Sequence, residues 1–158
     1  MTGRSTAHAT FSIERDYLSR PSQVFAAFAD PHKKRRWFAE GEGFTVDSFE
    51  MDFRVGGHEK ARFRFKDGTP VPEGTSSAND TWYCDIVENE RIVIAYVMSV
   101  GGARISSSLA TFEFVGHGSG TQLVYTEQAV FFEDSDGPQL REQGWRSLFD
   151  ALEKELTA

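Results

Sequence analysis

One change of hydrophobic period, late in the chain, constrains the fold more than any other feature. From about residue 44 to residue 132, apolar and polar residues alternate, as in "HEKARFRF" at 58–65, and this period of two is typical of strands with one buried face. After "DSDGP" the spacing becomes helical, and the apolar positions are Leu140, Trp145, Leu148, Phe149, Leu152 and Leu156. A sheet with one apolar face must be covered, and only this long helix is available to cover it.

The width of such a sheet creates a second constraint. A helix is about 10 Å across, so it cannot by itself fill a twisted, curved sheet of six or seven strands. The remaining space must be filled by side chains or left as a cavity. The chain has 14 Phe among its 158 residues, and aromatic residues make up 13% of it. Large aromatic side chains suit either outcome, so the pattern leaves the two open.

The N-terminal part of the chain adds one strand and two short helices. "ATFSIERDYL" at 9–18 alternates and predicts a half-buried strand, whereas residues 1–8 are small and polar and are expected to form a disordered tail. Pro21 and the pair Asp30-Pro31 are helix-start signals. Residues 9–158 are therefore expected to form a single domain of the α+β class.

The segments between residues 44 and 132 are joined by turn sequences, which predicts a consecutive antiparallel sheet. The widest interruption is "KDGTPVPEGTSSAND" at 66–80, which is rich in Gly, Pro and Ser. We expect a long loop there, of the kind that can act as a mobile flap beside a site.

Charge and cysteine content exclude several classes of function. The formal net charge of −7 does not favour binding to nucleic acid or to an anionic membrane. No apolar run approaches the ~20 residues of a membrane-spanning helix, and the N-terminus has no secretory apolar segment. The single cysteine, Cys84, cannot form an internal disulfide and is expected to pack as a small hydrophobe in a reducing compartment. We therefore expect a cytoplasmic protein without nucleic-acid binding or membrane insertion.

Motifs for metal, cofactor or covalent chemistry are not found in the sequence. The four histidines lack metal-ligand spacing, and the glycine pairs do not form a phosphate-binding loop between strand and helix. No serine stands in a nucleophile elbow. The sequence therefore predicts no metal, no cofactor and no catalytic residue.

The order of strand, two short helices, strands and long helix resembles the helix-grip fold. The family it looks like is the START-like (SRPBCC) superfamily, in particular the group related to the activator of the Hsp90 ATPase. The resemblance covers residues 10–156 and is carried by "IERDYLSRPSQVFAAFADP" with the tryptophan after it, "DFRVGG", "YCDIVENERIV", "GTQLVYTEQ" and "GWRSLFDALEKEL".

The resemblance implies an apolar cavity between the sheet and the C-terminal helix that holds lipids, polyketides or other hydrophobic molecules. One branch of the family implies a chaperone-interacting regulator instead. Two positions depart from the family pattern. Glu88-Asn89 replaces two prolines, and Glu59 stands where an aromatic residue is usual, which puts a carboxylate at an expected apolar wall.

Three polar residues are candidates for the inner face. Arg15 lies two residues from both Ile13 and Tyr17, so it shares their face of the strand and is expected to point inward. A cation in that position needs a partner. Glu127 shares a face of the last strand with Leu123 and Tyr125. The fold that the chain resembles places this strand beside the first one. We predict an Arg15–Glu127 ion pair, with either a structural role or a contact to a polar ligand group. Glu59 faces the cavity, or lies outside if its strand begins later.

The cationic run Lys33–Arg36 has two interpretations. It can form an electropositive patch for a phosphate or an acidic partner, or a solvated face of a short helix. Four consecutive helical residues point to all sides, so they cannot all face one ligand. The solvated face is the favoured interpretation.

These observations lead to one principal functional hypothesis. The protein binds a small hydrophobic or amphipathic ligand without catalysis, as a monomer or weak dimer; the alternatives are a cyclase or hydrolase using the same cavity, or a chaperone-interacting regulatory module. Trp82 is a further candidate for the cavity wall. The predicted ligand-binding residues are Arg15, Trp37, Glu59, Phe63, Phe65, Tyr83, Tyr96, Phe112, Glu127, Trp145 and Phe149.

Overall fold

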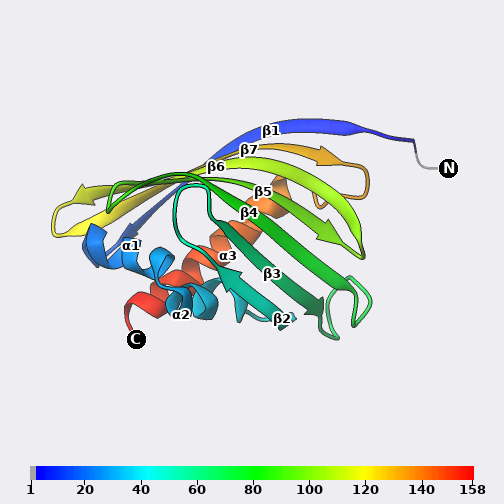
Figure 1. Cartoon of the computed structure of the whole chain (residues 1–158), viewed down its shortest axis with the longest axis horizontal. Coiled ribbons are helices and arrows are strands. Elements are labelled where there is room, and N and C mark those ends of the chain that lie inside the picture. Colours follow the sequence, from blue (N-terminus) through cyan, green and yellow to red (C-terminus); the bar gives the residue numbers. More distant parts are fainter. Residues whose placement is uncertain (1–2) are drawn as a thin grey trace.

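The fold is a seven-stranded antiparallel sheet that curves around one long helix (Figure 1). The structure is a computed structural model and describes residues 3–158. Its elements in chain order are β1 (Thr6–Tyr17), α1 (Pro21–Ala29), α2 (Pro31–Lys34), the π-helix η1 (Arg35–Ala39), β2 (Phe44–Met51), β3 (His58–Phe65), β4 (Ser76–Val87), β5 (Arg91–Val100), β6 (Ala103–His117), β7 (Gly120–Phe132) and α3 (Pro138–Leu156).

The strand order is β1-β7-β6-β5-β4-β3-β2. Strands β2 to β7 each pair with the next strand in the chain, and β1 joins the sheet beside β7. Helix α3 lies across the concave face, and α1, α2 and η1 cover the end of that face near the C-terminus of α3 (Figure 1). This arrangement confirms the predicted α+β helix-grip fold.

Two segment boundaries differ from those expected. Strand β1 begins at Thr6, which pairs with Phe132, so residues 6–8 belong to the sheet rather than to a tail; residues 1 and 2 lie outside the described residues. Strand β4 begins at Ser76, so the loop expected over residues 66–80 is shorter. The segment "SSAND" pairs with β3 and β5. Its residues are polar and show no apolar alternation, so the sequence pattern placed the start of β4 too late.

The capping predictions for the short helices agree with the structure. Pro21 is the first residue of α1, and the side chain of Asp30 accepts hydrogen bonds from the backbone N–H groups of His32 and Lys33 at the start of α2. The cap also explains why the pKa of Asp30 is lowered, since these N–H groups stabilise its charged form.

The buried stripe of α3 differs from the predicted one at its first turn. Trp145, Phe149 and Leu152 are buried, but Leu140 is 60% exposed, and the position one turn before Trp145 holds Arg141, which is 5% exposed. At about 100° per residue, residue 141 lies on the same side of the helix as Trp145, whereas residue 140 has rotated away. Leu140 was predicted to be buried because it is hydrophobic, but the helical geometry places Arg141 on the buried side instead.

Strand β4 turns Cys84 and Trp82 outward. Both side chains are exposed, and a register shift interrupts the pairing of β4 with β5 between Tyr83 and Asp85. The predictions of a packed Cys84 and of Trp82 in a cavity wall are therefore wrong, because Tyr83 takes the inward position between them. No helix within residues 3–158 is both long and apolar enough to cross a membrane.

Candidate ligand-binding site

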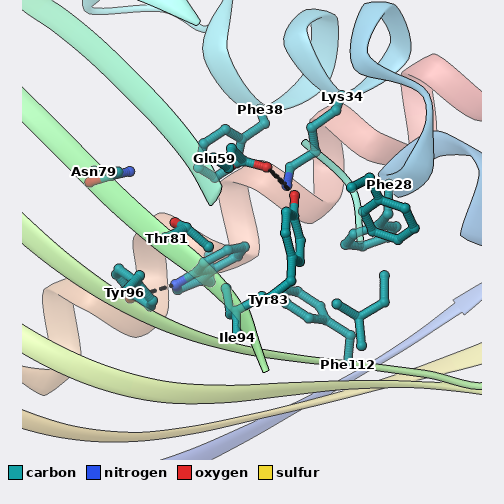
Figure 2. A pocket seen from close by; sticks show the side chains of 13 residues that line it. Phe28, Lys34, Phe38, Glu59, Asn79, Thr81, Tyr83, Ile94, Tyr96 and Phe112 are labelled. Carbon is teal, nitrogen blue, oxygen red and sulfur yellow. Dashed lines mark hydrogen bonds and ion pairs between the residues drawn. The ribbon is translucent and has the colours of Figure 1, made fainter. Parts of the chain in front are cut away.

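A small chamber lies between the sheet, α3 and the short helices (Figure 2). Its volume is about 20 Å³, which is room for one water molecule. Of the two outcomes that the sequence left open, aromatic side chains have filled most of the hollow. The residues that line the chamber are Phe28, Lys34, Phe38, Phe53, Glu59, Asn79, Thr81, Tyr83, Ile92, Ile94, Tyr96, Phe112 and Trp145.

Aromatic contacts around Trp145 close the chamber on the side of α3. The ring of Trp145 lies 4.6 Å from that of Tyr125 and 5.7 Å from that of Phe112, measured between centroids. Phe38, which is only partly buried, lies 6.1 Å from Trp145. Tilted and edge-on pairs at these distances are favourable beyond their burial, so they stabilise the closed chamber.

A buried ion pair forms one end of the chamber. Lys34 Nζ donates a hydrogen bond to Glu59 Oε1 over 2.9 Å, and the Tyr83 hydroxyl donates to the same oxygen over 2.6 Å (Figure 2). Lys34 and Glu59 are only 7% and 2% exposed. Burial, and then the charge of Glu59, raise the pKa of Tyr83 far above its usual range, so the phenol keeps the proton that it donates.

Aromatic rings surround the ammonium group of Lys34. Its Nζ lies 4.7 Å from the ring centroid of Phe38, 5.6 Å from that of Trp37 and 5.9 Å from that of Phe28, all within cation–π range. The prediction of a solvated cationic run is therefore wrong for Lys34. It holds better for Arg35 and Arg36, which form ion pairs with Glu40 and Glu155 nearer the surface.

A glycine turn holds Glu59 in place beside Tyr83. Gly57 N–H donates to the carbonyl of Arg54, and Tyr83 N–H donates to the carbonyl of Gly57 over 3.0 Å. A Cβ atom at Gly57 would collide with the carbonyl oxygen of Asp52. The "DFRVGG" segment thus requires glycine at this position, and the turn fixes where β3, and with it Glu59, begins.

A second buried carboxylate, Glu127, lies near the N-terminal end of α3, beside Arg141. It is completely buried and accepts hydrogen bonds from the hydroxyls of Tyr96, Tyr125 and Ser108 over 2.6–2.8 Å. Arg141 Nη1 lies 3.3 Å from Glu127 Oε2 and completes the ion pair. Burial, together with the charge of Glu127, raises the pKa of Tyr96 well above its usual range.

Arg141 connects this network to the loop before α3. Its guanidinium donates to both oxygens of Asp136 over 2.9 Å and to the Ser106 hydroxyl over 2.8 Å. It also donates to the hydroxyl of Tyr96, which in turn accepts a hydrogen bond from the indole of Trp145. The network therefore ties α3 to β5, β6 and β7.

The predicted Arg15–Glu127 pair is wrong. The β1–β7 register places Arg15 opposite Leu123, whereas Glu127 is opposite Phe11. Arg15 instead forms an ion pair with Asp150 on α3, over 2.8 Å, with its side chain 21% exposed. Arg15 and Glu127 were correctly predicted to lie on the same side of the sheet. The register of β1 against β7 could not be predicted from the sequence, and it separates the two charges.

The predicted site residues divide into two groups. Five of them line the chamber: Glu59, Tyr83, Tyr96, Phe112 and Trp145. The others lie around it or further away. The indole of Trp37 donates to the carbonyl of Ala27, and Phe149 packs against Tyr125; Phe63 and Phe65 pack against Phe44 near the sheet edge, and Glu127 and Arg15 form the ion pairs described above.

Sequence reasoning missed eight of the thirteen residues of the chamber wall, among them the polar residues Lys34, Asn79 and Thr81. Lys34 stands four residues before Phe38, which is about one helical turn, and this spacing was the available signal. Asn79 and Thr81 alternate with Tyr83 on one face of β4, but they were assigned to the loop or its boundary. The Oδ1 atom of Asn79 is buried and accepts no hydrogen bond from any of residues 3–158.

The chain matches one family model over residues 19–157, that of the activator of Hsp90 ATPase homolog 1-like proteins. The chain belongs to this family. Its fold is compatible with binding either a ligand or a chaperone, and the match does not specify either. No protein with a curated description is similar enough to match the chain.

Solved structures agree with this assignment. A putative uncharacterized protein from Rhizobium leguminosarum has 39% sequence identity and a TM-score of 0.90, with 99% of each chain covered. A protein from Rhizobium loti has 43% identity and a TM-score of 0.84, covering 96% of this chain and 99% of the other. An AHSA1-like protein from Aeromonas hydrophila, at 20% identity and a TM-score of 0.67 over 94% and 92% of the chains, shares the fold.

Proposed function

We propose that this family member binds a small amphipathic molecule in the chamber between the sheet and α3. The observation that carries the proposal is the buried Oδ1 of Asn79, which accepts no hydrogen bond from residues 3–158 at a wall made mostly of apolar groups. An unpaired buried polar atom costs about 1–3 kcal/mol, so it calls for a partner such as water or a ligand.

The chemical make-up of the wall supports the same proposal. Ligand sites are typically apolar with a few polar groups that fix orientation. Here Ile92, Ile94 and Phe112 offer apolar contact, while Asn79 and Thr81 lie on the neighbouring strand. Apolar burial contributes about 25 cal/mol per Å² to affinity before the cost of ordering the ligand.

The size of the chamber limits how binding occurs. Its 20 Å³ holds one water molecule, whereas sites for drug-sized ligands have roughly 300–1,000 Å³. A lipid- or polyketide-like ligand therefore requires side chains to move. Phe38 and Phe53 are the partly buried aromatic residues of the wall, and we propose that they rotate outward when the ligand enters.

Native mass spectrometry of the protein purified from its own host tests the proposal. We expect an adduct that denaturation releases. Asn79→Leu, which removes the unpaired amide and fills the chamber, should reduce the adduct. Ala78→Leu, on the outer face of the same strand, should leave it unchanged. A wild-type protein without an adduct that also fails to bind added amphipathic probes would refute the proposal.

The family description favours a second candidate, regulation of a chaperone ATPase. A purified Hsp90 homologue from the same host provides the direct test. We expect its ATPase rate to rise in a saturable manner when the protein is added, if the second candidate is correct. An unchanged rate together with an undetectable complex would exclude it.

A further inference from the structure

We infer that the end of the chamber at Glu59 is a cation-binding subsite, which the ammonium group of Lys34 occupies as a built-in occupant and a ligand's ammonium group can take over. The inference rests on the proposed ligand binding. It assigns the ligand a chemical class, an organic ammonium ion with an apolar chain.

The geometry around Lys34 Nζ is that of a site for an ammonium ion. Three aromatic rings, from Phe28, Trp37 and Phe38, lie within 4.7–5.9 Å, and the Glu59 carboxylate lies 2.9 Å away. Aromatic rings combined with an anion recognise ammonium groups through charge rather than through a directional hydrogen bond. The same surroundings would therefore accept another ammonium group.

The two members of the ion pair differ in their freedom to move. Glu59 is part of β3 and is paired on both sides, with Met51 of β2 and Thr81 of β4. Lys34 is the last residue of the four-residue helix α2, and its neighbours Lys33 and Arg35 are partly exposed. A lysine with a long flexible stem at this position can swing its ammonium group into water, whereas the carboxylate cannot leave the sheet.

Charge balance then selects the ligand. Removing Lys34 alone would leave the buried Glu59 without its cation and with only the hydrogen bond from Tyr83, which is destabilising. An incoming ammonium group restores the charge balance, while an incoming carboxylate would bring a second anion to Glu59. Of the displacing ligands, only a cation keeps the buried charge paired, and its apolar chain would lie against Ile92, Ile94 and Phe112.

Three probes of equal chain length test the inference on the wild-type protein: hexyltrimethylammonium, hexanol and hexanoate. Titration calorimetry measures affinity, and lysine acetylation followed by mass spectrometry measures the exposure of Lys34. We expect hexyltrimethylammonium to bind at least about tenfold more tightly than the other two. It should also accelerate acetylation of Lys34 while that of Lys33, its neighbour in the chain, stays constant.

Variants sharpen the test. Lys34→Ala removes the built-in occupant, so hexyltrimethylammonium should bind about tenfold more tightly than to the wild type. Lys34→Ala/Glu59→Gln should lose this gain, and Arg35→Ala, an outward change in the same cationic run, should leave binding unchanged. If Lys34→Ala does not fold, the acetylation of Lys34 in the wild type decides.

The outcomes separate this inference from the proposed function. Preferred binding of hexanol or hexanoate would overturn the cation subsite and still support an amphipathic ligand. Binding of the cation without faster acetylation of Lys34 would also overturn the subsite. If none of the probes binds to any variant, both the subsite and ligand binding in the chamber are wrong.

Discussion

Residues 3–158 contain two buried carboxylates, Glu127 and Glu59, which differ in how many hydrogen bonds they accept. Glu127 receives hydrogen bonds from three hydroxyls and the guanidinium of Arg141, all from long strands or α3. Glu59 receives two, from Lys34 and Tyr83, and both end on Oε1. A full set of donors on rigid elements fixes a structure, whereas a sparse set that depends on a short helix leaves room for exchange.

The cations that pair with the two carboxylates, Arg141 and Lys34, also differ in how many groups hold them. Arg141 is held by Asp136, Ser106 and Tyr96 in addition to Glu127, so its removal disturbs several elements. Lys34 is held by Glu59 and by aromatic rings, which do not depend on a fixed direction of its N–H groups. We therefore assign Arg141 and Glu127 to the stability of the fold, and Lys34 and Glu59 to the proposed ligand exchange.

The largest effect is expected for Arg141→Met. It leaves Glu127 buried without its cation, so the free energy of unfolding should fall by about 3–5 kcal/mol. Urea unfolding of the variant and the wild type measures the difference. The double variant Arg141→Met/Glu127→Gln should recover part of the loss. A loss below about 1 kcal/mol would show that the hydroxyls alone compensate Glu127.

A smaller loss is expected for Lys34→Met, about 1.5–3 kcal/mol, the range for a hydrogen bond to a charged group. Glu59 keeps the hydrogen bond from Tyr83, and the chamber has room for a water molecule beside it. The same urea experiment gives the value. If Lys34→Met costs as much as Arg141→Met, the contrast between the two networks fails.

Asn79→Leu is expected to change stability in the opposite direction. Replacing the unpaired amide by an apolar side chain should raise the free energy of unfolding by about 1 kcal/mol, while it weakens ligand binding. Thermal unfolding followed by circular dichroism detects the gain. A clear loss of stability would mean that the amide is satisfied in solution and contributes to the fold.

The smallest effect is expected at the surface pair of Arg36 and Glu155, which links η1 to α3 through two hydrogen bonds. The bond from Arg36 lowers the pKa of Glu155, so the pair stabilises the protein above the unfolded pKa and loses this contribution as pH falls through the folded value. Arg36→Met should therefore be slightly less stable at pH 7. The difference from the wild type should shrink as the pH falls below the ordinary range of a glutamate and through the lowered pKa of folded Glu155. Urea unfolding over a series of pH values measures it, and a difference independent of pH would indicate lost packing instead of lost charge.

Five of the thirteen residues that line the chamber could be predicted from the sequence. Glu59 was predicted from the alternation of its strand and Trp145 from the period of α3, whereas Tyr83 and Tyr96 were predicted as aromatic candidates for the wall. All four line the chamber. Lys34 was missed because it belongs to a run of four cationic residues. The sequence of such a run does not tell which of its side chains points into the protein, because this depends on how the helix packs. Asn79 and Thr81 were missed because polar residues at the edge of a loop do not show the alternation of a strand.

The sequence by itself determined the type and order of the elements, because each depends on residues within a few positions of one another: proline and aspartate at the helix starts, period two in the strands, and period 3.6 in α3. Only the tertiary structure decided which charges pair and how much of the hollow remains. Arg15 and Glu127 are far apart in the chain, and a register offset of four residues between β1 and β7 was enough to exchange Leu123 for Glu127. The size of the chamber likewise depends on how aromatic rings from α1, η1, the sheet and α3 interlock, and packing of that kind is a property of the assembled core.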